Sequence, residues 1–250
     1  MTKVQCLDIG NTSTKLGLFD GKKLTNVTQF NTSQLINNPT DIIHIIENRN
    51  AILSYCSVVP NAERVLLQGL EHFRHKIHPV NSNSRGNLPL SYPNPQEIGS
   101  DRIANAIAAF NTKTLPAVVI DLGTATTFDI VTAENGYEGG IILPGPQGFL
   151  DYLSSSTALL PKMFIPKKCT FRLPYGKSTE DAMLIGVCTG YKAMIEGIIN
   201  KLEVELCELK HQEPNFVVSG GSSLNFDFIK CEQNENLTLE GLRLALDLTL

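Results

Sequence analysis

The stretch Pro116–Val131, PAVVIDLGTATTFDIV, sets the architecture that we expect for this chain. Its apolar run Ala117–Ile120 is rich in Val and Ile and predicts a buried strand, and Phe128–Val131 predicts the strand that returns. The turn between them carries Asp121, Gly123 and three threonines. Gly123 lets the backbone approach a phosphate closely, the hydroxyl and N–H groups can donate to its oxygens, and Asp121 can hold a cation. Taken alone, the stretch is equally compatible with a polar β-hairpin turn.

The same pattern occurs once more, near the N-terminus. Val4–Leu7 and Leu16–Phe19 predict two strands, and the turn between them reads Asp8-Ile9-Gly10-Asn11-Thr12-Ser13-Thr14-Lys15. The two threonine-containing Asp-x-Gly turns lie nearly half a chain length apart, which indicates the repeat of a whole domain. Two similar halves that offer such turns to a shared cleft would suit a nucleoside triphosphate held from both sides. We therefore expect domains at residues 1–114 and 115–250, and the pairing makes a chance polar turn the less favoured interpretation.

Composition narrows the class of protein. The chain has 250 residues and a net charge of −4, and no cluster of Lys and Arg exceeds a pair, so it lacks the basic footprint of a nucleic-acid or anionic-membrane binder. The N-terminus shows no signal-peptide pattern, and no apolar run approaches a membrane span. The six cysteines are scattered without a Cys-x-x-Cys pair. We expect reduced thiols, a cytoplasmic location and no membrane or nucleic-acid partner.

Strand and helix patterns alternate through both halves and predict an α/β fold. Residues 81–100 show no periodicity and form a connection too long for an ordinary loop, which favours a functional or a disordered segment. In the second half, Ser178 and the acids that follow it predict the start of a helix from about Glu180 to Leu209. Gly186 and Gly190 lie on one side of that helix and predict close helix packing.

A short motif, Gly99-Ser100-Asp101-Arg102, follows the long connection and precedes the Ala-rich helix pattern Ile103–Phe110. Ser100 is a natural N-cap, which would place Asp101 and Arg102 in the first helical turn. Asp101 gains there from the helix dipole, so we expect a low pKa for it. A cation at that end is unfavourable, and Arg102 therefore indicates an anionic partner outside the helix.

Taken in order, these motifs resemble those of the type III pantothenate kinases, a family within the actin/hexokinase/Hsp70-like ATPase superfamily. The resemblance spans nearly the whole chain and rests on the spacing of five short motifs. They are Asp8-Ile9-Gly10-Asn11-Thr12 with Lys15, Gly99–Arg102, Asp121-Leu122-Gly123-Thr124-Ala125-Thr126, Gly139–Gly145 and Thr157-Ala158-Leu159-Leu160-Pro161. It implies duplicated ribonuclease H-like, actin/hexokinase-type domains with mixed five-stranded sheets and a central nucleotide cleft.

The resemblance also implies an activity and a set of site residues. The activity is ATP-dependent phosphorylation of pantothenate at its primary hydroxyl, the first step toward coenzyme A, with Mg²⁺, activation by K⁺ or NH₄⁺, and a homodimer whose second subunit closes the pantothenate pocket. Asp101 would be the proton acceptor and Asp121 the ligand of the monovalent cation. ATP would contact Asp8, Ile9, Gly10, Asn11, Thr12, Ser13, Thr14, Lys15 and Thr124, and pantothenate would contact Tyr92, Gly99, Ser100, Asp101, Arg102 and Thr179.

Phosphoryl transfer depends on positioning and charge neutralisation, which suits these residues. A base poised near the working pH would be ideal, whereas a carboxylate in a first helical turn is expected to have a low pKa. In a loose transition state the attacking hydroxyl keeps its proton until late, so Asp101 would mainly orient it and collect the proton afterwards.

Two other interpretations remain open at this point. One is a kinase or phosphatase of the same superfamily that acts on another acceptor. The other is a non-catalytic protein, such as a transcription accessory factor, a nucleotide-switched chaperone or a filament, because a common fold does not determine function. The presence of Asp8, Lys15, Asp101 and Asp121 together argues against a protein that only binds nucleotide.

Overall fold

The computed structural model describes residues 3–49, 51–222, 226 and 231–247. Its elements divide into two compact units, and the first consists of Met1–Lys113, Val131–Glu138 and Asn236–Leu250. The second consists of Thr114–Ile130 and Gly139–Glu235. The sequence analysis expected one boundary between residues 114 and 115. In the structure, Val131–Glu138 and Asn236–Leu250, which follow that boundary in the chain, make their contacts with the first unit.

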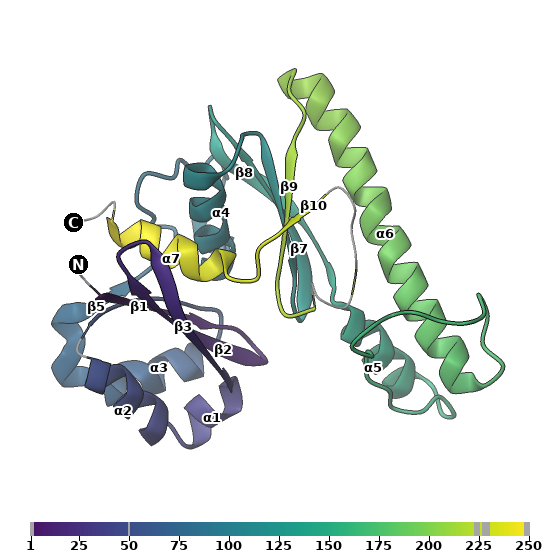
Figure 1. Ribbon diagram of the computed structural model, residues 1–250, viewed down its shortest axis with the longest axis horizontal. Helices are drawn as coiled ribbons and strands as arrows, with labels where there is room; N and C mark the ends of the chain where they lie inside the picture. The colour runs from purple at the N-terminus through teal and green to yellow at the C-terminus, as the bar shows by residue number, and fades with distance from the viewer. Residues whose placement is uncertain (1–2, 50, 223–225, 227–230, 248–250) are drawn as a thin grey trace. The chain divides into compact units, whose positions relative to one another are not determined.

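The first unit contains a five-stranded sheet in the order β3-β2-β1-β4-β5 (Figure 1). β1 pairs antiparallel with β2 and parallel with β4, so the sheet is mixed. The strands are β1 (Lys3–Ile9), β2 (Ser13–Asp20), β3 (Lys23–Asn31), β4 (Ile52–Ser57) and β5 (Ile77–Pro79). The helices are α1 (Thr32–Asn37), α2 (Thr40–Arg49), α3 (Pro60–Gly69), α4 (Ser100–Thr112) and α7 (Leu237–Asp247), with 3₁₀ turns η1 (Glu71–Lys76) and η2 (Pro95–Glu97).

The alternation of side chains along β1 and β4 assigns each to one face of this sheet. Leu7 and Leu53 are fully buried in the cluster that includes side chains of α1, α2 and α3. Residues one step along the strand face the other way, and the hydroxyl of Ser54 donates to the carbonyl of Leu242 in α7. Asp8 and Cys56 share the parity of Ser54, so they project on the face that α4 and α7 cover.

The second unit repeats this topology. Its sheet has the order β10-β9-β6-β7-β8, so β6 takes the place of β1 and β9 the place of β4, and β6 pairs parallel with β9 as β1 does with β4. The strands are β6 (Ala117–Leu122), β7 (Ala125–Thr132), β8 (Gly136–Pro144), β9 (Asn215–Ser219) and β10 (Cys231–Gln233). The helices are α5 (Pro146–Ser156) and α6 (Thr179–Lys210). The α/β fold with duplicated actin-like domains is therefore confirmed.

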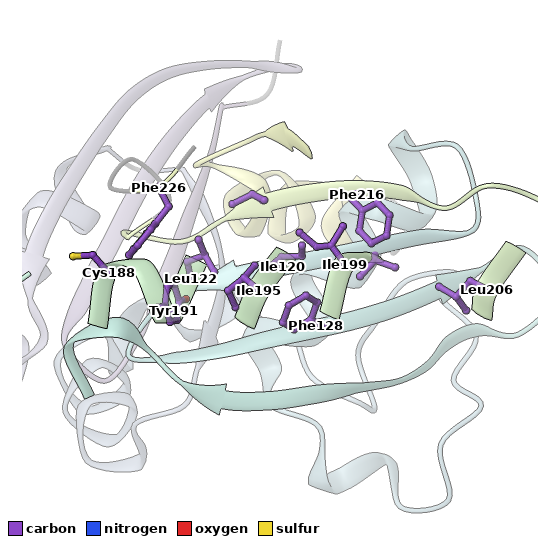
Figure 2. Packing of buried hydrophobic residues seen from close by; sticks show 12 residues of the cluster. Ile120, Leu122, Phe128, Cys188, Tyr191, Ile195, Ile199, Leu206, Phe216 and Phe226 are labelled. Carbon is purple, nitrogen blue, oxygen red and sulfur yellow. The ribbon is translucent and has the colours of Figure 1, made fainter. Parts of the chain in front are cut away.

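The core of the second unit forms between this sheet and α6. Tyr191, Ile195 and Ile199 follow one another along the helix and pack against strand residues that include Ile120 and Phe128 (Figure 2). The predicted helix start is confirmed, because the hydroxyl of Ser178 accepts a hydrogen bond from the N–H of Asp181 at 3.1 Å. That single hydrogen bond satisfies one of the N–H groups that a helix start leaves unpaired.

By length and composition alone, α6 could cross a membrane, with a mean hydropathy of 1.4 in its most apolar window. The sequence expectation that no run approaches such a span is therefore wrong by this measure. One helix of this kind is weak support for a membrane protein, because helices in the cores of soluble proteins have the same properties. In this fold one side of α6 is occupied by the sheet.

Candidate active site

The first polar turn connects β1 to β2 as a tight hairpin. The N–H of Gly10 donates to the carbonyl of Ser13 at 3.0 Å, and Asn11 and Thr12 are exposed at the tip. Asp8 and Lys15 are direct partners across the two strands. Residues paired in this way project from the same face, so a carboxylate and an ammonium flank the turn.

Thr32, which the sequence analysis did not single out, stabilises this turn through hydrogen bonds. Its hydroxyl donates to the carbonyl of Gly10 at 2.6 Å and contacts the hydroxyl of Thr14 at 3.0 Å. Its N–H donates to the carbonyl of Thr12 at 3.1 Å. Thr14 and Ile9 are fully buried. Of the eight predicted ATP-contacting residues in and beside this turn, these two can therefore offer a ligand their backbone but not their side chains.

Two carboxylates meet around a buried thiol at the carboxyl end of β4. The thiol of Cys56 donates to Oδ1 of Asp8 at 3.5 Å, across the parallel β1–β4 pair. Burial first, and then the negative charges of Asp8 and Asp101, raise the pKa of this thiol well above its usual value. Cys56 thus stays protonated and neutral between the two carboxylates. No local pattern predicted this role for Cys56, because the sequence does not reveal that β4 lies beside β1.

Ser100 does not cap α4 as predicted. Gly99 is the N-cap residue, and no side chain caps the helix. The hydroxyl of Ser100 instead donates to the carbonyl of Ser57 at 2.7 Å and accepts from the N–H of the same residue at 3.0 Å. These two hydrogen bonds join the start of α4 to the end of β4. They hold Asp101, in the first turn as predicted, beside the Cys56 thiol.

The prediction of a low pKa for Asp101 is wrong. Burial raises the pKa of this carboxyl above its usual value, although the N–H of Arg102, which donates to Oδ1 at 2.8 Å, and the Arg102 charge act in the opposite direction. Desolvation of a carboxylate therefore outweighs a backbone donor and a nearby cation at this helix start. A carboxylate with a raised pKa is a better proton acceptor.

Two of the predicted acceptor-site residues, Tyr92 and Arg102, are linked through an aromatic residue that the sequence analysis overlooked. The guanidinium carbon of Arg102 lies 5.8 Å from the centre of the Tyr137 ring, within the range of a cation–π contact. The Tyr92 ring meets Tyr137 edge-on, with ring centres 6.0 Å apart. Tyr137 is fully buried, and its N–H donates to the carbonyl of Pro89 at 3.0 Å. The long connection is thereby fixed beside the start of α4.

The second polar turn connects β6 to β7 and is packed against glycine backbone. The N–H of Gly123 donates to the carbonyl of Ala125, and the N–H of Gly145 donates to the carbonyl of Thr124, both at 3.0 Å. Gly220, at the end of β9, has a φ of +91°. A Cβ there would lie 2.5 Å from Oδ1 of Asp121. Thr124 is exposed at this turn.

Thr179, the remaining predicted contact of pantothenate, lies on α6 away from this turn. On α6, Tyr191 lies close to the second polar turn, because its hydroxyl is hydrogen-bonded to that of Thr126 at 2.7 Å. Burial raises the pKa of Tyr191 to about 12; the hydrogen bond with Thr126 lowers this pKa, and the charge of Asp121 raises it. Thr179 is twelve residues earlier on the same straight helix, which corresponds to roughly 18 Å. Asp121 and Thr179 therefore do not belong to one cluster within the second unit.

Gly186 and Gly190 do not make the predicted close helix contact with any part of the chain that the structure describes. Among those residues, nothing lies within 4 Å of a Cβ built at either position. Both line a groove of about 340 Å³ between α5 and α6, with Phe149, Tyr152 and Met194 among its other lining residues. Tyr152, on α5, is 67% exposed, and Val204, farther along α6 on the same side as the glycines, is 57% exposed. This side of α6 is apolar and open.

Solved structures with the same fold include proteins of different kinds. A conserved protein from Campylobacter jejuni, assigned to the Baf family of transcriptional activators, superposes with a TM-score of 0.59 at 20% identity and covers 97% of both chains. Component A of the (R)-2-hydroxyglutaryl-CoA dehydratase from Acidaminococcus fermentans gives 0.53 at 13% identity over the full length of both chains. At these identities the likeness shows the fold alone.

Sequence comparison is more specific. The chain is 38% identical over 246 residues to a type III pantothenate kinase from Methylacidiphilum infernorum, covering 95% of this chain and 86% of the relative. It is 33% identical over 251 residues to one from an Anaeromyxobacter species, covering 95% and 96%. A family model, type III pantothenate kinase, matches residues 5–201. This chain belongs to the type III pantothenate kinase family.

Proposed function

We propose that this chain transfers the γ-phosphoryl group of ATP to the primary hydroxyl of pantothenate, with Asp101 as the acceptor of the hydroxyl proton. Family membership supports the reaction. The observation that carries the role of Asp101 is the meeting of two carboxylates, Asp8 and Asp101, around the neutral Cys56 thiol. A polar turn used only to bind nucleotide would not require a second carboxylate with a raised pKa beside it.

The first turn is the proposed phosphate loop for ATP. Asn11, Thr12, Ser13 and Lys15 offer side chains, while Ile9, Gly10 and Thr14 offer backbone groups, since Ile9 and Thr14 are buried. Thr124 would contact ATP from the second turn. Asp8 fits Mg²⁺, because carboxylate oxygen is a preferred ligand of this ion and the neutral thiol on Oδ1 adds no competing charge. When bound, Mg²⁺ neutralises the charge of the phosphates.

Asp121 is the proposed ligand of a monovalent cation, K⁺ or NH₄⁺. Its carboxylate is half-buried against the backbone of Gly220, where no side chain of that residue competes for the space. Carboxylate and carbonyl oxygens are the donors that such cations prefer.

The proposed acceptor pocket is built around Asp101. The hydrogen bonds of Ser100 hold the start of α4 on β4, and Gly99 leaves room for the Asp101 carboxylate, because a Cβ at Gly99 would lie 2.6 Å from Oδ1. Tyr92, edge-on to Tyr137, supplies an aromatic wall, and Arg102, also in contact with Tyr137, supplies a cation. A cation suits pantothenate, which carries a carboxylate. Asp101 orients the hydroxyl, and the raised pKa favours its taking the proton as the phosphoryl group departs from ATP.

The proposed assembly is a homodimer formed through the open side of α6. Gly186, Gly190 and Gly197 have nothing within 4 Å of a built Cβ, so a second helix could approach closely there. The family resemblance also implies that the second subunit closes the pantothenate pocket. Gly190→Arg should leave the chain folded but monomeric in size-exclusion chromatography. Gln68→Arg, on exposed α3, is the control and should stay dimeric, and a dimeric Gly190→Arg protein would contradict this interface.

A cytoplasmic protein without nucleic-acid or membrane partners fits these features. The six cysteines are free thiols, as expected in a reducing compartment, and the net charge is −4.

The decisive experiment measures ADP release with and without pantothenate, in K⁺ and in Na⁺ buffers. We expect release to depend on pantothenate and to be faster in K⁺. ADP release that is unaffected by pantothenate but stimulated by another alcohol would assign a different acceptor. No release under any condition would favour a binding protein.

A further inference from the structure

Two thiols outside the proposed active site lie in contact at one end of the second unit's core. Cys188, in the third turn of α6, is 2% exposed, and its thiol is hydrogen-bonded to that of Cys169. Cys169 lies in the irregular segment that precedes α6 and is half-buried. Figure 2 shows Cys188 at the end of the row of α6 side chains, beside Phe226. The two thiols therefore come from different segments, the irregular one before α6 and the helix itself.

The two members of this pair differ in reactivity. Burial, followed by the contact with Cys169, raises the pKa of Cys188 to about 12. Because the thiolate is the nucleophile, Cys188 starts a thiol–disulfide exchange with an external reagent only slowly at neutral pH. Cys169 is the more exposed of the two, so an incoming reagent reaches it first.

A cavity gives small molecules access to both sulfurs. Its volume is about 740 Å³, within the range of small-molecule sites, and its lining includes Cys169, Cys188, Lys168, Lys192 and Gln233. Lys192 forms an ion pair with Glu196 at 3.7 Å, and Glu196 also lines the cavity. Two lysines against one glutamate leave this lining with a positive charge, which favours a reagent that carries carboxylates.

We propose that Cys169 and Cys188 form an oxidisable thiol pair, which a small carboxylate-bearing disulfide converts into an intramolecular disulfide. The thiolate of Cys169 attacks one sulfur of the reagent, forms a mixed disulfide and releases the first reagent thiol. The sulfur of Cys188 then attacks the Cys169 sulfur, gives up its proton and releases the second reagent thiol. Two protein sulfurs are oxidised and the two reagent sulfurs are reduced, so atoms and electrons balance.

The pair can complete the second step because its sulfurs are already in contact. Thiol–disulfide exchange passes through a mixed disulfide, and a resolving thiol next to it replaces a slow bimolecular step by a fast intramolecular one. The resulting disulfide would close a loop that contains the start of α6. It would tie the irregular segment before α6 to the third turn of the helix.

The test uses the full-length reduced protein, treated with oxidised glutathione, quenched in acid, alkylated and mapped by peptide mass spectrometry. In the wild-type protein we expect a peptide pair joined through Cys169 and Cys188 as the main product, reversed by dithiothreitol. Cys188→Ser should instead accumulate Cys169 as the glutathione adduct. In Cys169→Ser, modification of Cys188 should be at least ~10-fold slower than that of Cys169 in the wild type.

Cys207→Ser, which removes an exposed thiol from the same helix, is the matched control and should give the wild-type product. Cys188→Ala, checked for folding by circular dichroism, replaces Cys188→Ser if the hydroxyl disturbs the buried site. Accumulation of the glutathione adduct of Cys169 in the wild-type protein would overturn the proposal. So would the same distribution of products in the wild type and in the Cys188 variants.

Discussion

The two polar turns have the same sequence pattern and occupy the same place in two sheets of the same topology, yet their neighbours differ. Beside Asp8, β4 places the side chain of Cys56, and the chain continues so that the N–H of Val58 reaches the carbonyl of Ile9. Beside Asp121, β9 places Ser219, and the N–H of Ser222 reaches the carbonyl of Leu122. The second connection is one residue longer, and Gly220 turns through a positive φ to accommodate it.

This difference separates the chemistry of the two carboxylates. Asp8 is next to a neutral thiol and shares that thiol with Asp101, so the first unit gathers acids where an alcohol could be deprotonated. Asp121 lies against the backbone of Gly220, and the hydrogen-bonded pair Thr126 and Tyr191 is close to it. This polar surrounding suits the binding of an ion. A duplicated loop thus acquires distinct roles from the strand beside it.

The largest effect should come from removing Asp101, the second carboxylate beside the Cys56 thiol of the first unit. Asp101→Asn should lower turnover at least ~10²-fold, because the amide cannot take the proton, while pantothenate still binds. Coupled ADP release gives the turnover, and titration calorimetry gives the binding. Turnover close to that of the wild type would remove Asp101 from the mechanism.

The next effect should come from the glycine that distinguishes the second turn. Gly220→Ala places a methyl group against Oδ1 of Asp121 in a backbone conformation that L residues avoid, so it should reduce the free energy of unfolding by about 2 kcal/mol. Gly221→Ala is the matched control, because no residue that the structure describes lies within 4 Å of its Cβ, and it should change stability by less than about 0.5 kcal/mol. Urea unfolding compares them, and equal effects would show that Gly220 is not required for this turn.

A smaller effect should come from the aromatic wall of the first unit. Tyr92→Leu loses the edge-on contact with Tyr137, which is worth about 1 kcal/mol, so the KM for pantothenate should rise about fivefold with little change in kcat. Tyr175→Leu, which changes an exposed ring of the second unit, should leave both constants unchanged. Steady-state kinetics separates the two, and an unchanged KM in Tyr92→Leu would exclude this residue from the pocket.

The smallest effect is a shift in pH dependence. Because burial raises the Asp101 pKa, kcat should fall on the acid side at a pH above the ordinary carboxyl value of 3.8. The folded state binds this proton more tightly than the unfolded state, so its contribution to stability is present at low pH and is lost as the pH rises through the raised pKa. Asp101→Asn should therefore be more stable than the wild type at neutral pH, and the difference should shrink toward acid. An acid limb at or below 3.8, or a less stable variant at neutral pH, would contradict this assignment.

Several elements were predictable because the signals for them are local. The period-two and period-3.6 patterns of apolar residues gave the strands around both turns and the long helix α6, and Ser178 gave the start of that helix. The short strand β10 was missed, since three residues carry too little pattern to be recognised. Ser100 was predicted as a cap because it precedes a helix pattern, but its hydroxyl bonds to β4, a partner 43 residues away in the chain.

The sequence by itself determined that this chain contains two copies of an acidic turn and that Asp101 lies in the first turn of a helix. Each of these features is recognised from a few consecutive residues. Only the tertiary structure decided that Cys56 lies between Asp8 and Asp101, that Tyr137 joins Tyr92 to Arg102, and that Asp101 has a raised pKa. Strand order and burial set these three results. Both depend on contacts between segments far apart in the chain, which no local pattern encodes.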